Sequence, residues 1–373
     1  MNEASEVHIF YRLVVDTNVL PNSLIPATPF PLPRHSGGFT VRSWEGSRSL
    51  AAMMSNNPYL RVAVCGWDLV SVPLLNSLQA SGCSQLGMLI FQGSRFEAGS
   101  LPVLARMMKQ CTSLTDLRVT YTDDGGEDIS QFLIPELSLP SSIRKLCLSY
   151  NGIDDTGMTA LSKSLANCTS LESLTLHRNN ITATGVTALA EVLEHNHELL
   201  ELDMAYNSVG EAGAHSLSKA LVSATRLTSL NLSGNKLSTY GALALAPFLR
   251  ISSSITSLNL HCNDIWAGKT KGHDVHDEAW KLIALLDSCQ SLKSVDLTYN
   301  GIQTFVSEDM KRFTQGMFAT SHTAEEIVTV LDGNGGAGDS GGGSSSSSSN
   351  SNKERERMGT SHTACMRPSE VRG

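Results

Sequence analysis

One sequence pattern returns five times at a fixed step between residues 143 and 265. The first copy, IRKLCLSYNGI, begins at Ile143, alternates apolar with polar residues and ends in Asn151 and Ile153. A constant step of this size is typical of a solenoid, in which one supersecondary unit is stacked repeatedly. The asparagines of successive copies are 28 residues apart: Asn151, Asn179, Asn207, Asn235 and Asn263.

Each copy has the pattern of a strand, a turn and a helix. The L-x-x-L-x-L frame predicts a short strand with inward leucines, and the asparagine can hydrogen-bond the backbone where the chain turns. A glycine such as Gly157 follows, and then apolar residues at helical spacing, such as Leu161 and Leu165. One unit cannot bury its apolar face alone. We therefore expect an α/β array with a parallel sheet on its concave side and helices on its convex side.

This frame resembles the leucine-rich repeats of the ribonuclease-inhibitor type, whose units are roughly 28 residues long. The resemblance implies a leucine-rich repeat solenoid, or horseshoe. It also implies a function, because members of that family mostly serve as protein-binding surfaces. The expected function is therefore a non-enzymatic scaffold or adaptor that binds another protein on the concave face.

Weaker copies extend the array in both directions. Three divergent units begin at Tyr59, and a last unit from Leu292 carries Asn300, 37 residues after Asn263. Together the copies predict nine strands in an array that spans residues 59–332. The divergent units are expected to place inward the pairs Val62 and Val64, Leu89 and Phe91, and Leu117 and Val119.

Three other segments depart from the repeat. Residues 1–58 are expected to form an irregular N-terminal cap, because the end of a solenoid core must be covered. Residues 266–278, WAGKTKGHDVHDE, form an insertion that is better explained as a solvated loop than as a metal site, since no third ligand accompanies its two histidines. Residues 333–373 begin with a Gly/Ser-rich stretch that is too polar to fold, which predicts a disordered tail.

Charge and cysteine usage limit the partners and the compartment. The formal net charge of −8 offers no basic surface for nucleic acid or membranes. No run of about 18 apolar residues and no N-terminal signal segment is present, so a cytoplasmic or nuclear location is expected. Four cysteines share one slot of the repeat, which favours small, reduced, buried side chains over disulfides. They are Cys83, Cys111, Cys168 and Cys289.

Candidate partner-binding residues come from the outward strand positions and from the position just before the turn asparagine. Tyrosine and arginine, which are enriched at interface hot spots, occupy the latter position in four consecutive units. The alternative is structural, with each tyrosine covering the corner of a neighbouring unit. The candidates are Tyr121, Tyr150, Arg178 and Tyr206, with Arg118, His177 and Asp203 beside them.

No motif for catalysis is found in the sequence. It lacks a phosphate-binding glycine loop, a zinc-protease helix and a nucleophile elbow, so we expect no enzyme activity, no cofactor, no metal and no small-molecule substrate. Two alternatives to the scaffold remain. One is a GTPase-activating protein of the Ran-activator type, which is also a repeat array of this class. The other is a structural subunit of a cytoskeletal or ciliary assembly.

Overall fold

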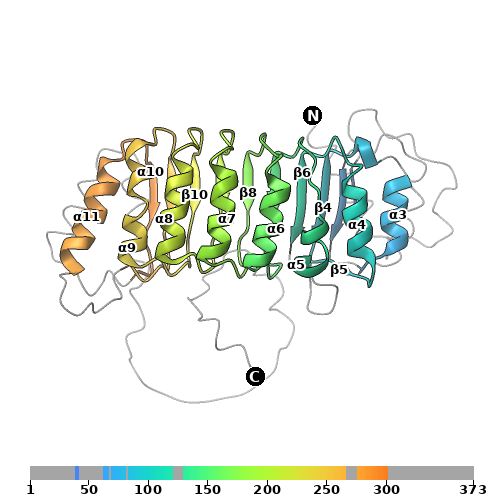
Figure 1. The fold of residues 1–373 in the computed structure, drawn as a ribbon, viewed down its shortest axis with the longest axis horizontal. Coiled ribbons are helices and arrows are strands. Elements are labelled where there is room, and N and C mark those ends of the chain that lie inside the picture. Colours follow the sequence, from blue (N-terminus) through green and yellow to red (C-terminus); the bar gives the residue numbers. More distant parts are fainter. Residues whose placement is uncertain are drawn as a thin grey trace, which may run out of the picture.

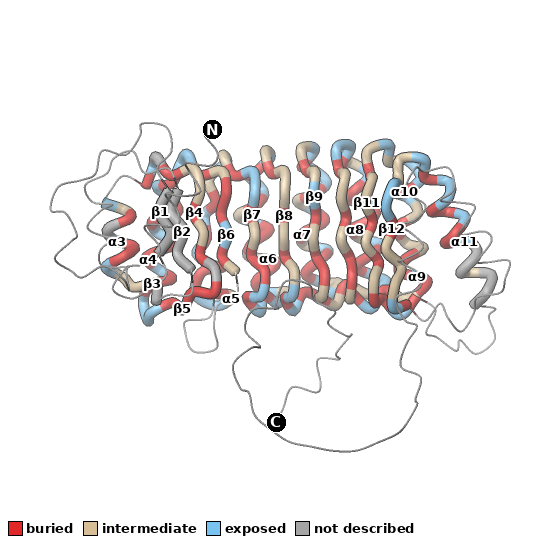
Figure 2. Tube along the Cα trace, turned by 180° about the vertical axis from the view of Figure 1, so that it is seen from behind, coloured by how far each residue is buried: buried red, intermediate tan, exposed pale blue. Residues whose placement is uncertain are grey.

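The computed structural model describes residues 38–41, 62–66, 69–80, 83–120, 129–265 and 275–300. Within these ranges, ten strands form one parallel sheet and a row of helices covers one of its faces, as Figures 1 and 2 show from opposite sides. This arrangement confirms the predicted α/β solenoid. The strands, in sheet order, are β1 (Gly38–Val41), β2 (Val62–Gly66), β4 (Met88–Gln92), β6 (Asp116–Thr120), β7 (Lys145–Cys147), β8 (Ser173–Thr175), β9 (Glu201–Asp203), β10 (Ser229–Asn231), β11 (Ser257–Asn259) and β12 (Ser294–Asp296).

The helices follow their strands in the order of the repeat, and neighbouring helices pack side by side (Figure 1). Short strands β3 (Leu69–Val70) and β5 (Arg95–Phe96) pair in a separate two-stranded sheet. The α-helices are α3 (Val72–Ala80), α4 (Ser100–Met108), α5 (Ile129–Phe132), α6 (Asp155–Leu165), α7 (Ala183–Leu193), α8 (Gly210–Leu221), α9 (Ser238–Leu243), α10 (Ala246–Ile251) and α11 (Val275–Ser288); the 3-10 helices are η2 (Cys83–Gln85) and η3 (Ile134–Glu136).

The leucine frame forms the core between the sheet and the helices. Leu174, Leu202, Leu230 and Leu258 are direct partners on neighbouring strands, and each is at most 1% exposed. The helices meet them with apolar residues at helical spacing, such as Leu161 of α6 and Leu189 of α7, both fully buried. Successive units thus bury one continuous apolar layer, as expected for stacked repeats.

The first part of the sheet corrects two predictions. Strand β1 pairs with β2 and adds a tenth strand within residues 1–58, where an irregular cap was expected. The predicted register of β2 was also wrong, because the pairing places Cys65, not Val64, beside Phe91. A shift of one residue exchanges the two faces of a strand. Val62 and Val64 therefore lie in the outward register, and Ala63 and Cys65 in the inward one.

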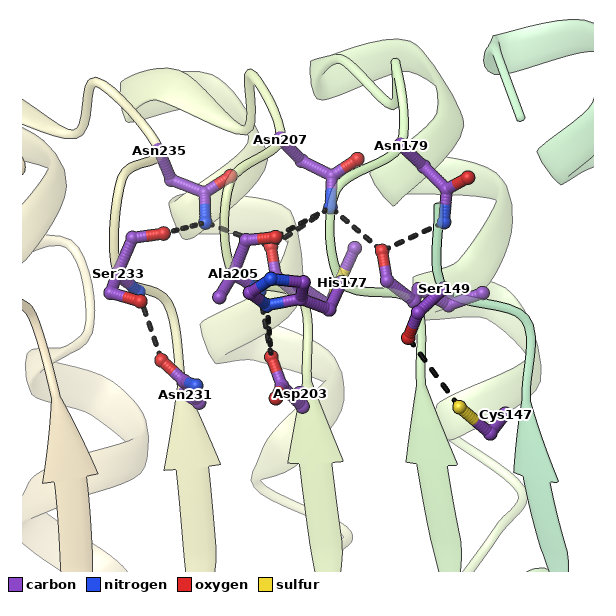
Figure 3. Close-up of polar contacts among 12 residues, drawn as sticks. Cys147, Ser149, His177, Asn179, Asp203, Ala205, Asn207, Asn231, Ser233 and Asn235 are labelled. Atoms are coloured by element: carbon purple, nitrogen blue, oxygen red, sulfur yellow. Dashed lines mark hydrogen bonds and ion pairs between the residues drawn. The ribbon is translucent and has the colours of Figure 1, made fainter. Parts of the chain in front are cut away.

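A ladder of buried asparagines joins the units at the turns (Figure 3). Asn179 is 6% exposed, and its side-chain oxygen accepts hydrogen bonds from the backbone amides of Asn151 and Ile153, both at 3.1 Å. Its amide nitrogen donates to the carbonyls of Leu148 and Leu176, at 3.0 and 2.9 Å. The predicted bond between the asparagine and the turning backbone is confirmed, and it connects two successive units.

The start of helix α7 is also held by the preceding unit. Asp155, the first residue of α6, accepts hydrogen bonds through Oδ1 from the amides of Thr182 and Gly185, at 2.8 and 2.9 Å. Its other oxygen accepts the Thr182 hydroxyl. A carboxylate in this position satisfies free amides and interacts favourably with the helix dipole. The α7 N-terminus therefore depends on a side chain from a different repeat.

The four cysteines of the shared slot are buried, as predicted. The Cys111 thiol donates to the Met107 carbonyl at 3.3 Å, and the Cys289 thiol donates to the Leu249 carbonyl at 2.9 Å. Burial raises the pKa of Cys168 to about 11. These thiols are free, and each fills a small space between a helix end and the next strand.

We expect iodoacetamide at pH 8 to modify Cys147 in the native protein and to leave Cys168 unmodified. With a pKa near 11, only roughly a thousandth of Cys168 is thiolate at that pH, and the group is 1% exposed, whereas Cys147 is half-buried on the sheet face. Peptide mass spectrometry with and without guanidinium chloride measures both sites. Equal labelling of the two cysteines in the native protein would contradict the buried slot.

Several predicted features lie outside the described residues. They include the cap apart from β1, the tail at 333–373 and residues 266–274 of the insertion. Helix α11 begins at Val275, so residues 275–278 of the predicted loop belong to a helix instead. Within the described ranges, no helix combines the length and the hydrophobicity needed to cross a membrane.

Candidate functional site

The candidate site lies where the central strands end, on the side of the sheet that the helices leave uncovered. The sequence predicts one outward-facing residue in each strand, between the two inward positions. From Ile90 onward this row is confirmed, because each of these residues pairs with the next across the sheet. Four residues after this row, in the units from Cys147 onward, the chain reaches the turn asparagines. The paired outward residues are Ile90, Arg118, Cys147, Thr175, Asp203, Asn231, Asn259 and Asp296.

The position before each turn asparagine has a left-handed backbone. Tyr150, Arg178 and Tyr206 have φ angles of 61°, 51° and 54°, and their amides donate to carbonyls of the next unit at 2.7–2.9 Å. Gly234 occupies the same slot with φ 65°. Glycine adopts this conformation without cost, whereas another residue pays roughly 1 kcal/mol or more. The turn therefore does not require a side chain at this position, yet three successive units have a large side chain there.

These side chains form one cluster of contacting rings with a guanidinium over them, which we call the ring cluster: Tyr150, His177, Arg178 and Tyr206. The His177 ring lies between the two tyrosines, with centroid distances of 5.3 Å to Tyr150 and 5.4 Å to Tyr206. The Arg178 guanidinium carbon lies over both tyrosine rings, at 4.6 Å from the Tyr206 centroid and 5.6 Å from that of Tyr150. Cation–π and edge-to-face contacts of this kind hold the side chains in fixed positions.

The ring cluster favours a neutral His177. Burial lowers the pKa of His177; the carboxylate of Asp203, whose Oδ1 is 3.9 Å from Nδ1, opposes this shift, and the positive charge of Arg178 adds to it. Burial disfavours the charged form of an imidazole, so the ring remains neutral at physiological pH. Arg178 is then the fixed positive charge of the cluster.

Asp203 has a structural role that the sequence analysis did not predict. Its Oδ1 accepts the amide of Ala205 at 2.9 Å, and Asn231 accepts the Ser233 amide in the same way (Figure 3). Asn259 and Asp296 also accept the amide two residues later. Such Asx turns explain why Asp and Asn occupy the end of each of these strands. The sequence signal for these turns is that Asp or Asn recurs at the last position of strands β9 to β12.

The structure does not bring all seven predicted residues together. Tyr150, His177, Arg178 and Tyr206 are in contact, and Asp203 lies beside His177. Arg118 is instead held by Asp116 of its own strand, with two hydrogen bonds at 3.0 and 2.9 Å. Tyr121 lies outside the described residues.

A second, smaller ring pair was not predicted. His261 lies 5.0 Å from Tyr299, ring centroid to centroid, and contacts the Thr298 hydroxyl through Nδ1. His177 and His261 occupy the same slot of the repeat, three units apart, which was the signal in the sequence. The ring cluster ends at Tyr206 because the next unit has Gly234 in the same slot. The Tyr206 ring lies against this glycine, where an added Cβ would be 2.6 Å from the ring.

The arrangement is suited to binding. It offers rigid aromatic area and one guanidinium on an open face. Among the residues that the structure describes, no group of three or more His, Cys, Asp or Glu side chains is placed to hold a metal ion.

Comparison with protein families identifies the repeat. Four segments match the leucine rich repeat family, at residues 140–162, 167–190, 224–246 and 288–304. The chain therefore contains leucine-rich repeats, and the fold is a leucine-rich repeat solenoid of the α/β class. A search of curated proteins gave no match.

Solved structures that match part of the chain include an actin-binding site and two bacterial proteins. Leiomodin-1 actin-binding site 2 is 16% identical, covers 45% of this chain and 90% of its own, and has a TM-score of 0.36. Internalin C2 of Listeria monocytogenes is 20% identical, with coverage of 61% and 76% and a TM-score of 0.37. Internalin InlF of the same bacterium is 18% identical, with coverage of 70% and 78% and a TM-score of 0.32. At these scores the likenesses carry no conclusion about function.

Proposed function

We propose that this chain is a non-enzymatic scaffold or adaptor that holds another protein on the face formed by its sheet, with the ring cluster as the main contact. The observation that carries the proposal is that large side chains occupy the left-handed position before the turn asparagine. Glycine satisfies the backbone there, but Tyr150, Arg178 and Tyr206 fill it at an energetic cost. Strained positions of this kind are concentrated at functional sites.

The chemistry of the ring cluster supports the same proposal. Tyrosine and arginine contribute most to binding where they are held rigidly, because little side-chain entropy is lost when the partner docks. Tyr150 is 41% exposed and Arg178 is exposed, while the ring of His177 between them is half-buried. A partner would thus meet a pre-arranged surface.

The finer features of the proposal follow the resemblance to ribonuclease-inhibitor repeats. The strand–turn–helix units and the backbone-to-asparagine bonds between residues 28 apart, such as Asn151 to Asn179, support that subtype. We further propose a cytoplasmic location, supported by reduced cysteines in the buried slot.

The test is an affinity purification from matched cell extract with the wild-type chain and a Tyr150→Gly/Arg178→Gly variant. Glycine suits the left-handed backbone at both positions, so we expect the melting temperature to stay within a few degrees while a stoichiometric partner is lost. Quantitative mass spectrometry and thermal unfolding measure the two effects. The expected loss is at least about tenfold, since hot-spot side chains each contribute roughly 2 kcal/mol or more.

A matched control is available on the helical side. Tyr240 of α9 is also 41% exposed, and Arg250 of α10 is exposed, so Tyr240→Ala/Arg250→Ala removes similar side chains from the other face. This variant should retain the partner. An unchanged partner set in the Tyr150→Gly/Arg178→Gly variant would overturn the proposal. Capture of a GTP-loaded small GTPase with accelerated hydrolysis would instead favour a GTPase-activating protein.

A further inference from the structure

We propose that the partner binds through an acidic side chain, Asp or Glu, which docks on Arg178 between Tyr150 and Tyr206. This inference rests on the proposed function and specifies the chemistry of its partner. It follows from the state of the Arg178 guanidinium, which differs from that of Arg118, Arg144 and Arg226.

Arg178 lacks the carboxylate that its counterparts have. Arg118 is paired with Asp116, Arg144 with Glu172, and Arg226 with Glu198. Arg178 forms no ion pair with any carboxylate in the described part of the chain; its guanidinium rests on two phenol rings instead. The array thus supplies an acidic partner for the arginines on either side and leaves one exposed cation in the ring cluster.

The Arg178 guanidinium keeps its N–H donors available. Its carbon lies over the Tyr206 and Tyr150 rings at 4.6 and 5.6 Å, and within the described residues none of the five N–H donors of its fork forms a hydrogen bond. That fork matches the two oxygens of a carboxylate, and charge-assisted pairs of this type are the stronger hydrogen bonds in proteins.

The surroundings favour one carboxylate over a larger anion. Asp203 is already engaged by the Ala205 amide and lies beside His177, so it does not neutralise Arg178. The net charge of the chain is −8, which disfavours a nucleic acid or another polyanion. An acidic residue followed by an apolar one would use both the guanidinium and the neighbouring rings.

The experiment selects random linear peptides, displayed on phage through their C-terminal ends, against the full chain, with counter-selection on Tyr150→Gly/Arg178→Gly. Enriched peptides are synthesised, and their dissociation constants are measured by fluorescence anisotropy. We expect an Asp or Glu at one fixed position. Changing it to Asn or Gln should weaken binding about ten- to hundredfold, as should Arg178→Gln.

A double-mutant cycle decides the assignment. The Arg178→Gln variant should bind the acidic peptide and its Asn or Gln form with equal affinity, because the ion pair between arginine and carboxylate can no longer form. Arg226→Gln, whose partner is Glu198, serves as the matched control and should leave binding unchanged. Arg178→Lys should restore only part of the affinity, since an ammonium lacks the fork.

The two proposals fail in different ways. If the acidic and amide peptides bind the wild-type chain equally, and Tyr150→Gly still abolishes binding, the carboxylate inference is overturned and the docking face stands. If no peptide is enriched, or if enriched peptides bind the ring-cluster variants as well as the wild type, both proposals are overturned.

Discussion

Replacing Asn179 by alanine should lower the free energy of unfolding by about 3 to 5 kcal/mol, a large effect for one substitution. The side chain makes four hydrogen bonds with the backbone of two repeats and is 6% exposed. Alanine would leave the amides of Asn151 and Ile153 without this acceptor in a buried turn. Each buried backbone group without a partner costs roughly 1 to 3 kcal/mol, and partial relaxation reduces the sum.

The neighbouring residue gives the control for this prediction. Asn180 is exposed, and its side chain makes a single weak contact, at 3.5 Å to the Gly152 carbonyl. Asn180→Ala should therefore change stability by less than about 0.5 kcal/mol. Urea unfolding followed by circular dichroism measures both variants. Similar midpoints for the two would show that the asparagine ladder contributes little to stability.

Gly185→Ala should destabilise the protein by about 2 to 4 kcal/mol, although alanine normally stabilises a helix. The Cβ of an alanine at this position would lie 2.6 Å from Oδ1 of Asp155 and 2.9 Å from the side chain of Ile181. The carboxylate would have to move, and it would then lose its bonds to the Thr182 and Gly185 amides. Overpacking and the loss of this cap add together.

Gly157 is the matched control, because it has the same place in helix α6. Its nearest neighbour for an added Cβ is Ile153 at 3.1 Å, and the Asp154 carboxylate is 3.5 Å away. A shift of a few tenths of an ångström accommodates the methyl group, so Gly157→Ala should stay within about 1 kcal/mol of the wild type. Thermal unfolding of the two variants provides the comparison, and a loss for Gly157→Ala as large as for Gly185→Ala would contradict it.

The sequence predicted the repeating unit well where its frame was strict. Asn179 was assigned to the turn because a buried amide is needed there, and the structure places it so. The frame failed at strand β2, where Val62, Ala63, Val64 and Cys65 are all small apolar residues. Alternation cannot set the register of such a run, and only the pairing with Phe91 does so. Strand β1 is short and lacks the frame altogether.

The candidate site was predicted as a slot with His177 and Asp203 beside it, but without the contacts between these side chains. The fixed step places Tyr150, Arg178 and Tyr206 in successive units, yet strand spacing of about 4.8 Å leaves the two tyrosines roughly 10 Å apart. His177, from another slot, fills that space, which periodicity alone does not reveal. The left-handed backbone was also hidden, because tyrosine and arginine rarely adopt it.

The long step before Asn300 shows where this solenoid tolerates added chain. Asn300 follows Asn263 by 37 residues, yet its side chain still accepts the Asn263 amide at 2.7 Å and the Ile265 amide at 3.2 Å. The extra length is therefore absorbed after the turn, and the registration of β12 on β11 is preserved. The entropic cost of closing a loop grows only slowly with the length of the loop. For protein engineering, the segment between Ile265 and α11 is a natural place to graft a reporter peptide or a second binding loop.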